Sequence, residues 1–568
     1  MKKRYLFCLL SLPLFAQSQS IHHTWQVQFA DELHAIAAAP NGHWFVGGAV
    51  GDPTLSFSEG YFAELDASGN MVRQVTFNLL ERTAVTAVLP LPDGRLVVGG
   101  YAEGCDFGYS GFVALYKATG MREWLAFKDW NTLNGEIVYV TDLISTPDGI
   151  LAIGSEKAQL FDLESGLELA QVDLPGYYQG AATGPDSLSV WLSGSHGISI
   201  LHLQDLSLEN IVPWVNTQDA FWQIASDKSD RFYTARQKNN LLLTGNTGGL
   251  TDSLNLDYKV YDIFAVGADV LLCGRKGGIG RVERRDSMLH LISGFDLPAP
   301  DLIPRRIRPE GANILLAGME LHGPPPRDYP GSVDSRNFWM QSFAPDGSTA
   351  VAGTDVALTE IIVNSTPKAT LYTNGPFGNY WSVLAPDVRV RVVNTGAKPI
   401  DKVHILASDY GQDLFFICFL YSSLFQSFDN LNLQPGESVV LPLGAISTLY
   451  VTSVKPWKLC IWAAVPDGLT DTNHENDYTC ASFNLTTVTA EPSVNALILY
   501  PNPVRDVLFI ENGPEPPGFC RIFNSVGQQA AELTPVFEQG RIRMELSDLP
   551  AGLYFLDTKE GWVRFIKE

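Results

Sequence analysis

The sequence predicts an all-β protein in three parts: a seven-bladed β-propeller, an immunoglobulin-like β-sandwich and a small C-terminal β-sandwich. Two observations carry this prediction. An apolar strand ending in small residues recurs through the first 353 residues, and longer alternating strands replace the repeat after Gly353. The composition agrees, because Gly and Pro number 50 and 34 while charged residues make up only 18% of the 568 residues. Many turn formers and few charges favour strands joined by turns.

The N-terminus has the three regions of a secretory signal peptide. Residues 2–4 are basic, residues 5–15 are apolar, and residues 16–18 offer small side chains for cleavage. This pattern predicts a signal peptide at residues 1–18 that is removed from the mature protein. No other stretch approaches the roughly 18 uninterrupted apolar residues of a membrane span, so we expect no transmembrane segment in the mature chain.

The repeat between residues 21 and 353 predicts the β-propeller. Seven copies follow one another at intervals of 38 to 55 residues, and such a period with several strands per unit is typical of propeller blades. A tight turn such as Pro92-Asp93-Gly94 precedes several copies, and a second hairpin is visible in several units, as at 62–69. The copies lie at 45–48, 96–100, 151–154, 190–194, 232–235, 270–274 and 314–318.

Four-stranded blades close into a ring because a single small sheet cannot cover both of its faces, whereas neighbours stacked around an axis cover them. The repeats resemble the loosely repeated propellers of many exported bacterial proteins. Because the period varies, six or eight blades are alternatives to seven. By analogy with other propellers, loops around the central channel are the first place to look for ligand contacts. The acidic and aromatic loop candidates are Asp52, Asp106, Tyr109, Tyr177, Tyr178 and Tyr329.

A second architecture spans residues 354–488. An alternating strand at 388–394 and strand-like segments at 459–465 and 478–483 predict an immunoglobulin-like β-sandwich. Its Asn-Thr-Gly turn at 394–396, its Leu-Gln-Pro-Gly-Glu stretch at 433–437 and its acidic loop resemble the bacterial cell-adhesion-related (CARDB) module. The resemblance implies an adhesive or spacer role.

Two of the six cysteines that remain after signal removal flank the acidic loop symmetrically. Cys460 and Cys480 lie at equal distances from Thr470, so a hairpin can bring them together in an oxidising compartment. We expect a disulfide between them, with two buried free thiols as the alternative. The other four cysteines are scattered over different domains, which favours small core residues. The sequence has no CxxC spacing, which excludes a zinc site of that kind.

The acidic loop at 467–477 contains oxygen donors at alternate positions, which can point into one concavity and hold a hard cation. The spacing departs from an EF-hand, because no Gly stands at the sixth position and no Glu at the twelfth. A solvated turn is the alternative, and apart from calcium we expect no cofactor. The calcium candidates are Asp471, Asn473, Glu475 and Asp477.

Residues 489–497 form a predicted linker to the last part, residues 498–568. This part opens with prolines on either side of an asparagine, continues with a Leu-Pro-Ala-Gly-Leu-Tyr turn and ends on a basic, apolar strand. In this order the motifs resemble the C-terminal sorting domain of type IX secretion substrates. The resemblance implies the type IX secretion machinery as a partner, passage through the periplasm, and a final place on the outer cell surface or outside the cell. The residues that carry it are Tyr500, Pro501, Asn502, Pro503, Gly527, Leu549, Pro550, Ala551, Gly552, Leu553, Tyr554 and Lys567.

The formal charge of −23 disfavours nucleic acid and anionic membranes as partners. The sequence has no short motif of a serine hydrolase, metalloprotease, P-loop or dinucleotide-binding enzyme. Ser195 and His196 are neighbours, but adjacent residues of a strand point to opposite faces, so we expect a turn and no catalytic pair. We therefore expect a non-catalytic exported protein whose propeller recognises a glycan, peptide or surface ligand. The alternative is a secreted hydrolase or lyase with its active site in the propeller channel.

Overall fold

The computed structural model describes residues 21–28, 30–52, 57–104, 108–127, 139–213, 221–227, 229–236, 240–323, 335–349, 354–375, 378–409, 424–450, 457–489, 498–500, 504–511, 520–524, 529–534, 536–538, 541–550, 552–558 and 561–567. In this part of the chain every element is a strand except η1 (Pro466–Gly468), a single 3-10 turn, which confirms the all-β prediction. No helix of the described residues has the length and apolarity needed to cross a bilayer. The predicted signal peptide and most of the predicted linker lie outside the described residues.

The chain divides into two compact units. The first comprises Met1–Lys368, Val383–Leu449 and Val454–Thr486, and the second comprises Ala369–Ser382, Tyr450–Ser453 and Thr487–Glu568.

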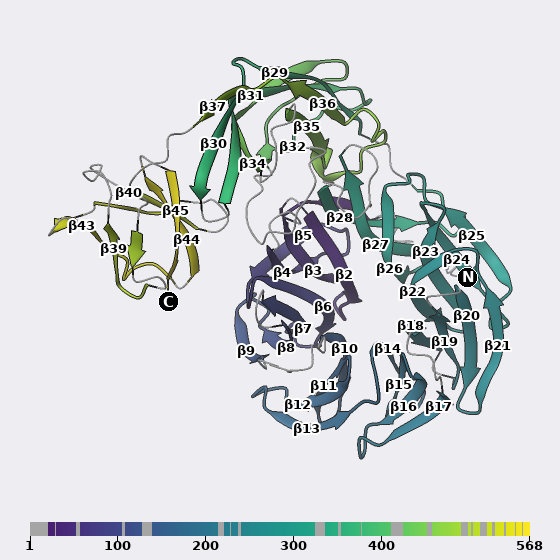
Figure 1. The fold of residues 1–568 in the computed structure, drawn as a ribbon. Helices are drawn as coiled ribbons and strands as arrows, with labels where there is room; N and C mark the ends of the chain where they lie inside the picture. Colours follow the sequence, from purple (N-terminus) through teal and green to yellow (C-terminus); the bar gives the residue numbers. More distant parts are fainter. Residues whose placement is uncertain are drawn as a thin grey trace, which may run out of the picture. The chain divides into compact units, whose positions relative to one another are not determined.

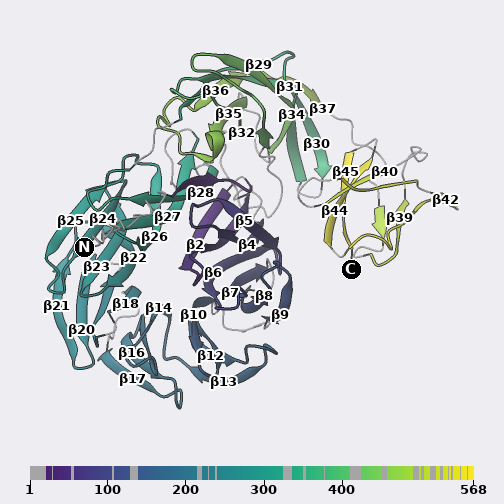
Figure 2. The same cartoon turned by 180° about the vertical axis from the view of Figure 1, so that it is seen from behind.

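The first unit begins with antiparallel meanders arranged around a common centre, and the first strand of each meander lies nearest that centre (Figures 1 and 2). The strands are β2 (Ala30–Ala38), β3 (Trp44–Asp52), β4 (Phe57–Leu65) and β5 (Met71–Phe77); β6 (Arg82–Pro90), β7 (Leu96–Gly104), β8 (Gly108–Tyr116) and β9 (Arg122–Phe127); β10 (Val140–Thr146), β11 (Gly149–Gly154), β12 (Lys157–Phe161) and β13 (Glu168–Asp173); β14 (Tyr178–Thr183), β15 (Ser189–Gly194), β16 (Gly197–His202) and β17 (Leu208–Pro213); β18 (Phe221–Ser226), β19 (Phe232–Arg236), β20 (Leu241–Asn246) and β21 (Gly249–Asn255); β22 (Lys259–Val266), β23 (Asp269–Lys276), β24 (Ile279–Arg285) and β25 (Leu291–Asp296); and β26 (Leu302–Glu310), β27 (Asn313–His322) and β28 (Ser335–Phe343).

Each predicted repeat lies in the second strand of a meander. The turn before β7 shows why the chain reverses there, since Gly94 adopts a φ of 85° and donates its N–H to the carbonyl of Leu91. Second strands are covered on both sides, and the first five residues of β7 are all buried. Outermost strands alternate instead, so that β13 exposes every residue except Ala170 and Val172, which are half-buried. This gradient is expected where sheets pack face to face around a centre.

The N-terminal strand β1 (His22–Trp25) completes the last meander. It pairs antiparallel with β28, from His22 opposite Gln341 to Trp25 opposite Phe338. A single parallel pair between Ala30 and Arg336 then joins β28 to β2. The two ends of the strand series are therefore held together by backbone hydrogen bonds, because the chain starts inside the sheet in which the series ends.

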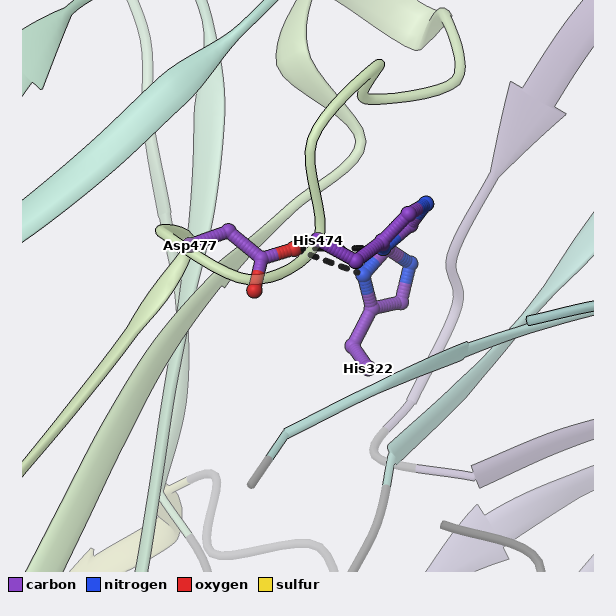
Figure 3. A group of neighbouring side chains, drawn as sticks. All are labelled: His322, His474 and Asp477. Atoms are coloured by element: carbon purple, nitrogen blue, oxygen red, sulfur yellow. Dashed lines mark ion pairs between the residues drawn. The ribbon is translucent and has the colours of Figure 1, made fainter. Parts of the chain in front are cut away.

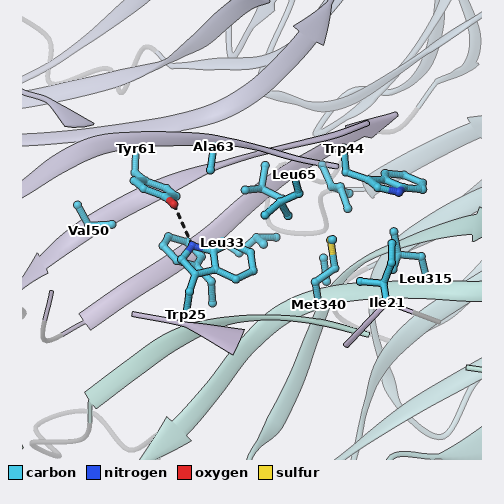
Figure 4. Packing of buried hydrophobic residues seen from close by; sticks show 14 residues of the cluster. Ile21, Trp25, Leu33, Trp44, Val50, Tyr61, Ala63, Leu65, Leu315 and Met340 are labelled. Atoms are coloured by element: carbon cyan, nitrogen blue, oxygen red, sulfur yellow. Dashed lines mark hydrogen bonds between the residues drawn. The ribbon is translucent and has the colours of Figure 1, made fainter. Parts of the chain in front are cut away.

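Aromatic packing supports this closure (Figure 4). The indole of Trp25 donates to the Tyr61 hydroxyl at 2.9 Å, and both rings stack on Phe338 with centroid distances of 5.2 and 4.8 Å. Leu33 and Met340 are buried in the same cluster, so side chains from β1, β2, β4 and β28 share one core. Burying large aromatic rings contributes several kcal/mol, which fixes β1 in place.

The rest of the first unit contains two further groups of strands. β31 pairs with β29 and β34, and its buried Val388, Val390 and Val392 alternate with more exposed Arg389 and Arg391. The order β33-β32-β35-β36 makes a second sheet, in which Trp457 and Trp462 are fully buried. The strands of this region are β29 (Val356–Val363), β31 (Gly378–Asn394) from Val383 on, β32 (Val403–Asp409), β33 (Leu424–Phe428), β34 (Ser438–Tyr450), β35 (Trp457–Ala464) and β36 (Tyr478–Phe483). Nearly all of β30 (Lys368–Gly375) and β37 (Thr486–Thr489) belongs to the second unit.

A disulfide joins Cys460 of β35 to Cys480 of β36, which lie directly opposite each other in the strand pairing. The loop between these strands contacts β1, which belongs to the last meander. Thr470 Oγ lies 3.1 Å from His22 Nε2, and Thr354 forms a parallel bridge with Asp471. Cys273 is a buried free thiol.

The second unit contains two four-stranded sheets with a common core. The orders are β38-β39-β43-β42 and β41-β40-β44-β45. Leu508, Ile542, Leu556 and Phe565 are among the core residues. Of the predicted sorting residues, Leu549 and Tyr554 are buried, and the Tyr554 hydroxyl donates to the Pro550 carbonyl at 3.0 Å. Residues 501–503, 527 and 551 lie outside the described residues. The strands are β38 (Ile498–Tyr500), β39 (Val507–Glu511), β40 (Cys520–Asn524), β41 (Gln529–Leu533), β42 (Val536–Glu538), β43 (Arg541–Glu545), β44 (Gly552–Thr558) and β45 (Gly561–Lys567).

Candidate functional site

The first strands of the meanders enclose a cavity of about 350 Å³. Among the described residues it is lined by six first strands, β2, β6, β10, β18, β22 and β26, and by Trp44 of β3. A volume of this size can hold a small ligand or one residue of a polymer. Small apolar side chains such as Ala37 and Val88 make up part of the wall. Its polar members are Thr86, Thr141, Asp142, Gln223, Asp262, Arg306 and Arg308.

Each first strand carries a β-bulge at the same place in its pairing with the second strand. In β6, Val85 pairs with Gly100 and Ala87 pairs with Gly99, so that Thr86 is an extra residue with no partner opposite. In β18 the irregularity covers Trp222 and Gln223. A bulge re-aims a side chain and interrupts the ladder, and such irregularities concentrate near binding sites. The polar residues of these bulges, which we call the polar ring, are His34, Thr86, Thr141, Gln179, Gln223, Tyr261 and Arg305.

The polar ring follows a sequence pattern of its own, separate from the apolar repeat. An apolar residue directly precedes each member of the polar ring, and another apolar residue follows two positions after it. Thr86, Thr141 and Gln223 line the cavity. The signal was therefore present in the chain, one strand before the apolar repeats. The seven copies read Leu-His-Ala-Ile at 33–36, Val-Thr-Ala-Val at 85–88, Val-Thr-Asp-Leu at 140–143, Tyr-Gln-Gly-Ala at 178–181, Trp-Gln-Ile-Ala at 222–225, Val-Tyr-Asp-Ile at 260–263 and Pro-Arg-Arg-Ile at 304–307.

Positive charge in the cavity wall comes from β26. Arg308 Nη1 donates to Asp262 Oδ2 at 2.6 Å, and the same oxygen accepts the Ile307 N–H at 2.9 Å. Arg306 has no carboxylate partner among the described residues, and its Nη1 donates to the Arg305 carbonyl at 3.2 Å. Among the described residues of the same cavity, Asp142 interacts with Arg306 electrostatically but forms no ion pair with it. A guanidinium that is not held in an ion pair can bind an anionic group through two parallel hydrogen bonds.

Asp142 faces the same cavity from β10. Its Oδ2 accepts the Ala181 N–H at 2.8 Å. Burial raises the pKa of this carboxyl to about 6, although the Ala181 hydrogen bond and the charges of Arg306 and Arg308 act in the opposite direction. The charge of the cavity therefore becomes more positive as the pH falls through 6.

Glu32 and Arg336 lie beside His34, a member of the polar ring. Arg336 Nη1 donates to Glu32 Oε1, and His34 Nε2 lies 3.7 Å from Glu32 Oε2. Burial lowers the pKa of His34 to about 4; Glu32 opposes this shift, whereas the charges of Arg305, Arg306 and Arg336 reinforce it. The imidazole is therefore neutral near pH 7, and the cations of this region are arginines.

Of the predicted loop residues, only Tyr177 and Tyr178 have side chains that the structure describes, and neither lines the cavity. Tyr178 is fully buried with its hydroxyl 3.0 Å from Ser199 Oγ, and Tyr177 is 40% exposed at a turn. Asp106 and Tyr329 lie outside the described residues, and the side chains of Asp52 and Tyr109 belong to the part that is not described.

Ser195 and His196 are closer than we expected from strand geometry. Ser195 Oγ lies 3.3 Å from His196 Nδ1, because both residues occupy the turn between β15 and β16, where the alternation of a strand does not apply. The same Oγ accepts the Tyr177 N–H at 3.1 Å. Ser195 therefore connects the two turns, and among the described residues no hydrogen bond other than that to Ser195 orients the His196 imidazole.

The acidic loop places its four predicted calcium candidates in different surroundings. Asp471 and Asp477 are buried, whereas Asn473 and Glu475 are exposed. The Asp471 oxygens accept the N–H groups of Asn473 and Val356 at 2.8 and 2.9 Å. Asp471 thus caps backbone groups at the start of the loop. Calcium binding by these four residues stays a prediction.

The C-terminal part of the chain matches a family model. Residues 498–567 match the secretion system C-terminal sorting domain, which supports export of the chain as a type IX secretion substrate to the cell surface or beyond it. No curated protein matches the sequence.

Solved structures that are similar over more than half of the chain include the following two. The virginiamycin B lyase from Staphylococcus aureus has 10% identity and a TM-score of 0.40, covering 57% of this chain and 99% of that one. A chain of a mitotic checkpoint complex has 14% identity and a TM-score of 0.41, covering 60% and 99%. At these TM-scores neither structure says what this chain binds or does.

Proposed function

We propose that this protein is an exported binding protein whose central cavity recognises a small ligand, or one residue of a polymer, through a carboxylate. In this proposal, residues 21–353 form a seven-bladed propeller, residues 354–488 an immunoglobulin-like, CARDB-type spacer, and residues 498–568 the sorting domain. The seven bulged first strands and the pairing of β1 with β28 support the blade count. The loosely repeated sequence is consistent with it.

The observation that carries the ligand class is the unpaired Arg306. In a chain with a formal charge of −23, a cavity with a guanidinium lacking a carboxylate partner selects for an anionic group. The hydroxyl and amide groups of the polar ring suit a ligand that also carries several hydroxyls. Acidic sugars of a surface glycan combine both features.

A binding comparison tests this assignment. The mature protein is applied to an array of acidic glycans and of neutral glycans matched to them except for the carboxylate. We expect binding to the acidic members and a loss of that preference in Arg306→Gln, while Arg306→Lys retains part of it. Equal binding of both classes, or a preference that survives in Arg306→Gln, contradicts the proposal.

Export is tested separately, by removing the sorting domain. A chain ending before residue 498 is expected to accumulate in the periplasm, whereas the full chain reaches the cell surface or the medium. Unchanged export of the truncated chain contradicts the type IX route and leaves the binding proposal standing.

A second candidate function is a secreted hydrolase or lyase, and Asp142 is the observation that favours it. A carboxyl with a pKa of about 6 can act as an acid or a base near neutral pH. Under this alternative, an acidic glycan that binds is also cleaved, and Asp142→Asn abolishes cleavage while binding persists. Full recovery of intact glycan after long incubation excludes it.

A further inference from the structure

Four buried side chains meet where the acidic loop contacts β27. Glu320 and His322 stand two residues apart on β27, so they lie on the same face of the strand. His474 and Asp477 come from the loop between β35 and β36 (Figure 3). Glu320, His322 and Asp477 are fully buried, and His474 is 5% exposed. We call these four residues the junction cluster.

The two imidazoles of the junction cluster are oriented in the same way. His322 Nδ1 and His474 Nδ1 lie 3.6 and 3.2 Å from the same oxygen, Asp477 Oδ2. The opposite nitrogens face Glu320, with His322 Nε2 at 3.5 Å from Oε2 and His474 Nε2 at 3.3 Å from Oε1. Asn337 on β28 donates to Glu320 Oε2 at 3.0 Å and holds that carboxylate in place. Asp477 therefore lies on the Nδ1 side of both imidazoles, which we call the front, and Glu320 lies on the Nε2 side, which we call the back.

The separations in front of the rings suit a tetrahedral metal ion. Nitrogen and oxygen ligands of zinc lie at about 2.0–2.1 Å from the ion, which places tetrahedral ligands about 3.3 Å from one another. The two nitrogen-to-oxygen distances of 3.2 and 3.6 Å bracket this value. Ligand atoms of His322, His474 and Asp477 all lie within 4.8 Å of one another.

Several buried atoms of the junction cluster make no hydrogen bond. Both oxygens of Asp477, Nδ1 of His322 and Oε1 of Glu320 are in this state. Buried polar atoms are normally satisfied, and buried carboxylates are normally neutralised by hydrogen-bonded partners or by a metal. An ion in front of the rings would coordinate His322 and Asp477 and would balance the charges of the two carboxylates.

We propose that the junction cluster binds one zinc ion through His322 Nδ1, His474 Nδ1 and Asp477, with His322 Nε2 hydrogen-bonded to Asn337 Oδ1 and His474 Nε2 facing Glu320 Oε1. A carboxylate behind a metal-bound histidine is the usual way of fixing the ring and its tautomer. Two imidazoles suit zinc and disfavour calcium, which takes oxygen ligands. Because the ligands come from β27 and from the loop before β36, the ion fastens the loop to the last meander. The site is buried and serves structure, with water or the second Asp477 oxygen as fourth ligand.

Metal titration of the mature protein, purified with a chelator, tests this site. We expect one zinc ion per chain, measured by competition with a chromophoric chelator, and loss of that ion in His322→Ala and His474→Ala. Glu320→Gln is expected to weaken zinc binding about 10- to 100-fold. Glu475→Gln is the matched control: its side chain is exposed on the same loop, so zinc binding should not change. Zinc binding that is equal in His322→Ala and in the wild type overturns the proposal.

Cobalt in the wild-type protein gives a second readout that does not depend on variants folding. A tetrahedral site with two imidazoles is expected to give intense visible absorption, which zinc then displaces. Zinc is also expected to raise the melting temperature where calcium does not, because an ion that binds only the folded state stabilises it. A weak, octahedral cobalt spectrum or no bound ion overturns the proposal. If calcium alone raises the melting temperature and Glu475→Gln removes the effect, the oxygen-rich loop is the metal site instead.

Discussion

The cavity and the junction cluster both bring cations and carboxylates together, but they differ in how the charges are matched. In the junction cluster each imidazole lies between two carboxylates, and all four side chains are buried. In the cavity Arg308 is paired with Asp262, whereas Arg306 beside it has no carboxylate partner among the described residues. Matched charges in a dry interior hold parts of the fold together, and an unmatched charge facing a cavity is available to a ligand.

This difference predicts that substitutions in the junction cluster lower the free energy of unfolding more than substitutions of exposed charges do. Glu320→Ala, measured in the presence of a chelator, is expected to lower the free energy of unfolding by about 3–5 kcal/mol, because it leaves two buried histidines with one carboxylate, Asp477, instead of two. The measurement is urea denaturation followed by tryptophan fluorescence. The control is Glu164→Ala, which removes an exposed partner of Arg95 and should cost less than about 1 kcal/mol. Similar losses in the two variants would remove the distinction between matched and exposed charges.

Arg306 is predicted to show the opposite behaviour. Arg306→Gln should weaken binding of an acidic ligand about 10- to 100-fold, the range expected for a charged hydrogen bond, with little change in unfolding free energy. Calorimetric titration and urea denaturation of the same preparation measure both quantities. A variant that loses stability but keeps its affinity would assign Arg306 to structure.

A residue of the polar ring is predicted to contribute less to ligand binding than Arg306 does. Gln223 lines the cavity from the bulge of β18. We expect Gln223→Ala to weaken ligand binding about 2- to 10-fold, the cost of one neutral hydrogen bond. Ser207→Ala, on an exposed turn outside the cavity, is the control and should leave binding unchanged. Equal affinities of the wild type and Gln223→Ala would show that the bulges only shape the strands.

The pH dependence of binding is the smallest predicted effect. The pKa of Asp142 is raised to about 6, so its carboxyl is mostly ionised at pH 7.5 and mostly neutral at pH 5. An anionic ligand meets less repulsion when this carboxyl is neutral, so affinity should rise several-fold as the pH falls from 7.5 to 5. His34, whose pKa is lowered to about 4, contributes no charge in this range. Asp142→Asn should bind with nearly constant affinity, and a slope equal to that of the wild type would assign the titration to another group.

The sequence predicted the repeated strands better than it predicted the site. Apolar strands with small ends are visible because burial on both faces demands them, as in Leu96, Val97 and Val98 of β7. Turn chemistry made the C-terminal domain recognisable. The polar ring was missed because each bulge adds a single polar residue, such as Thr86, to a strand that otherwise looks apolar.

The junction cluster could not be predicted from spacing. His322 and His474 are 152 residues apart, and they meet only because the loop before β36 folds back onto β27. The sequence did single out Asp477, but it grouped this residue with Asn473 and Glu475, which are exposed. Alternation of oxygen donors predicted one concavity, whereas the turn buries Asp471, His474 and Asp477 at intervals of three.

The cavity of the first unit is the proposed site for an anionic ligand. The most direct measurement is the ratio of affinities for an acidic sugar and its neutral counterpart, determined by calorimetry for the wild type and for Arg306→Gln. We expect a ratio well above 10 in the wild type that falls toward 1 in the variant. A wild-type ratio near 1, or a ratio that Arg306→Gln leaves unchanged, would contradict this assignment.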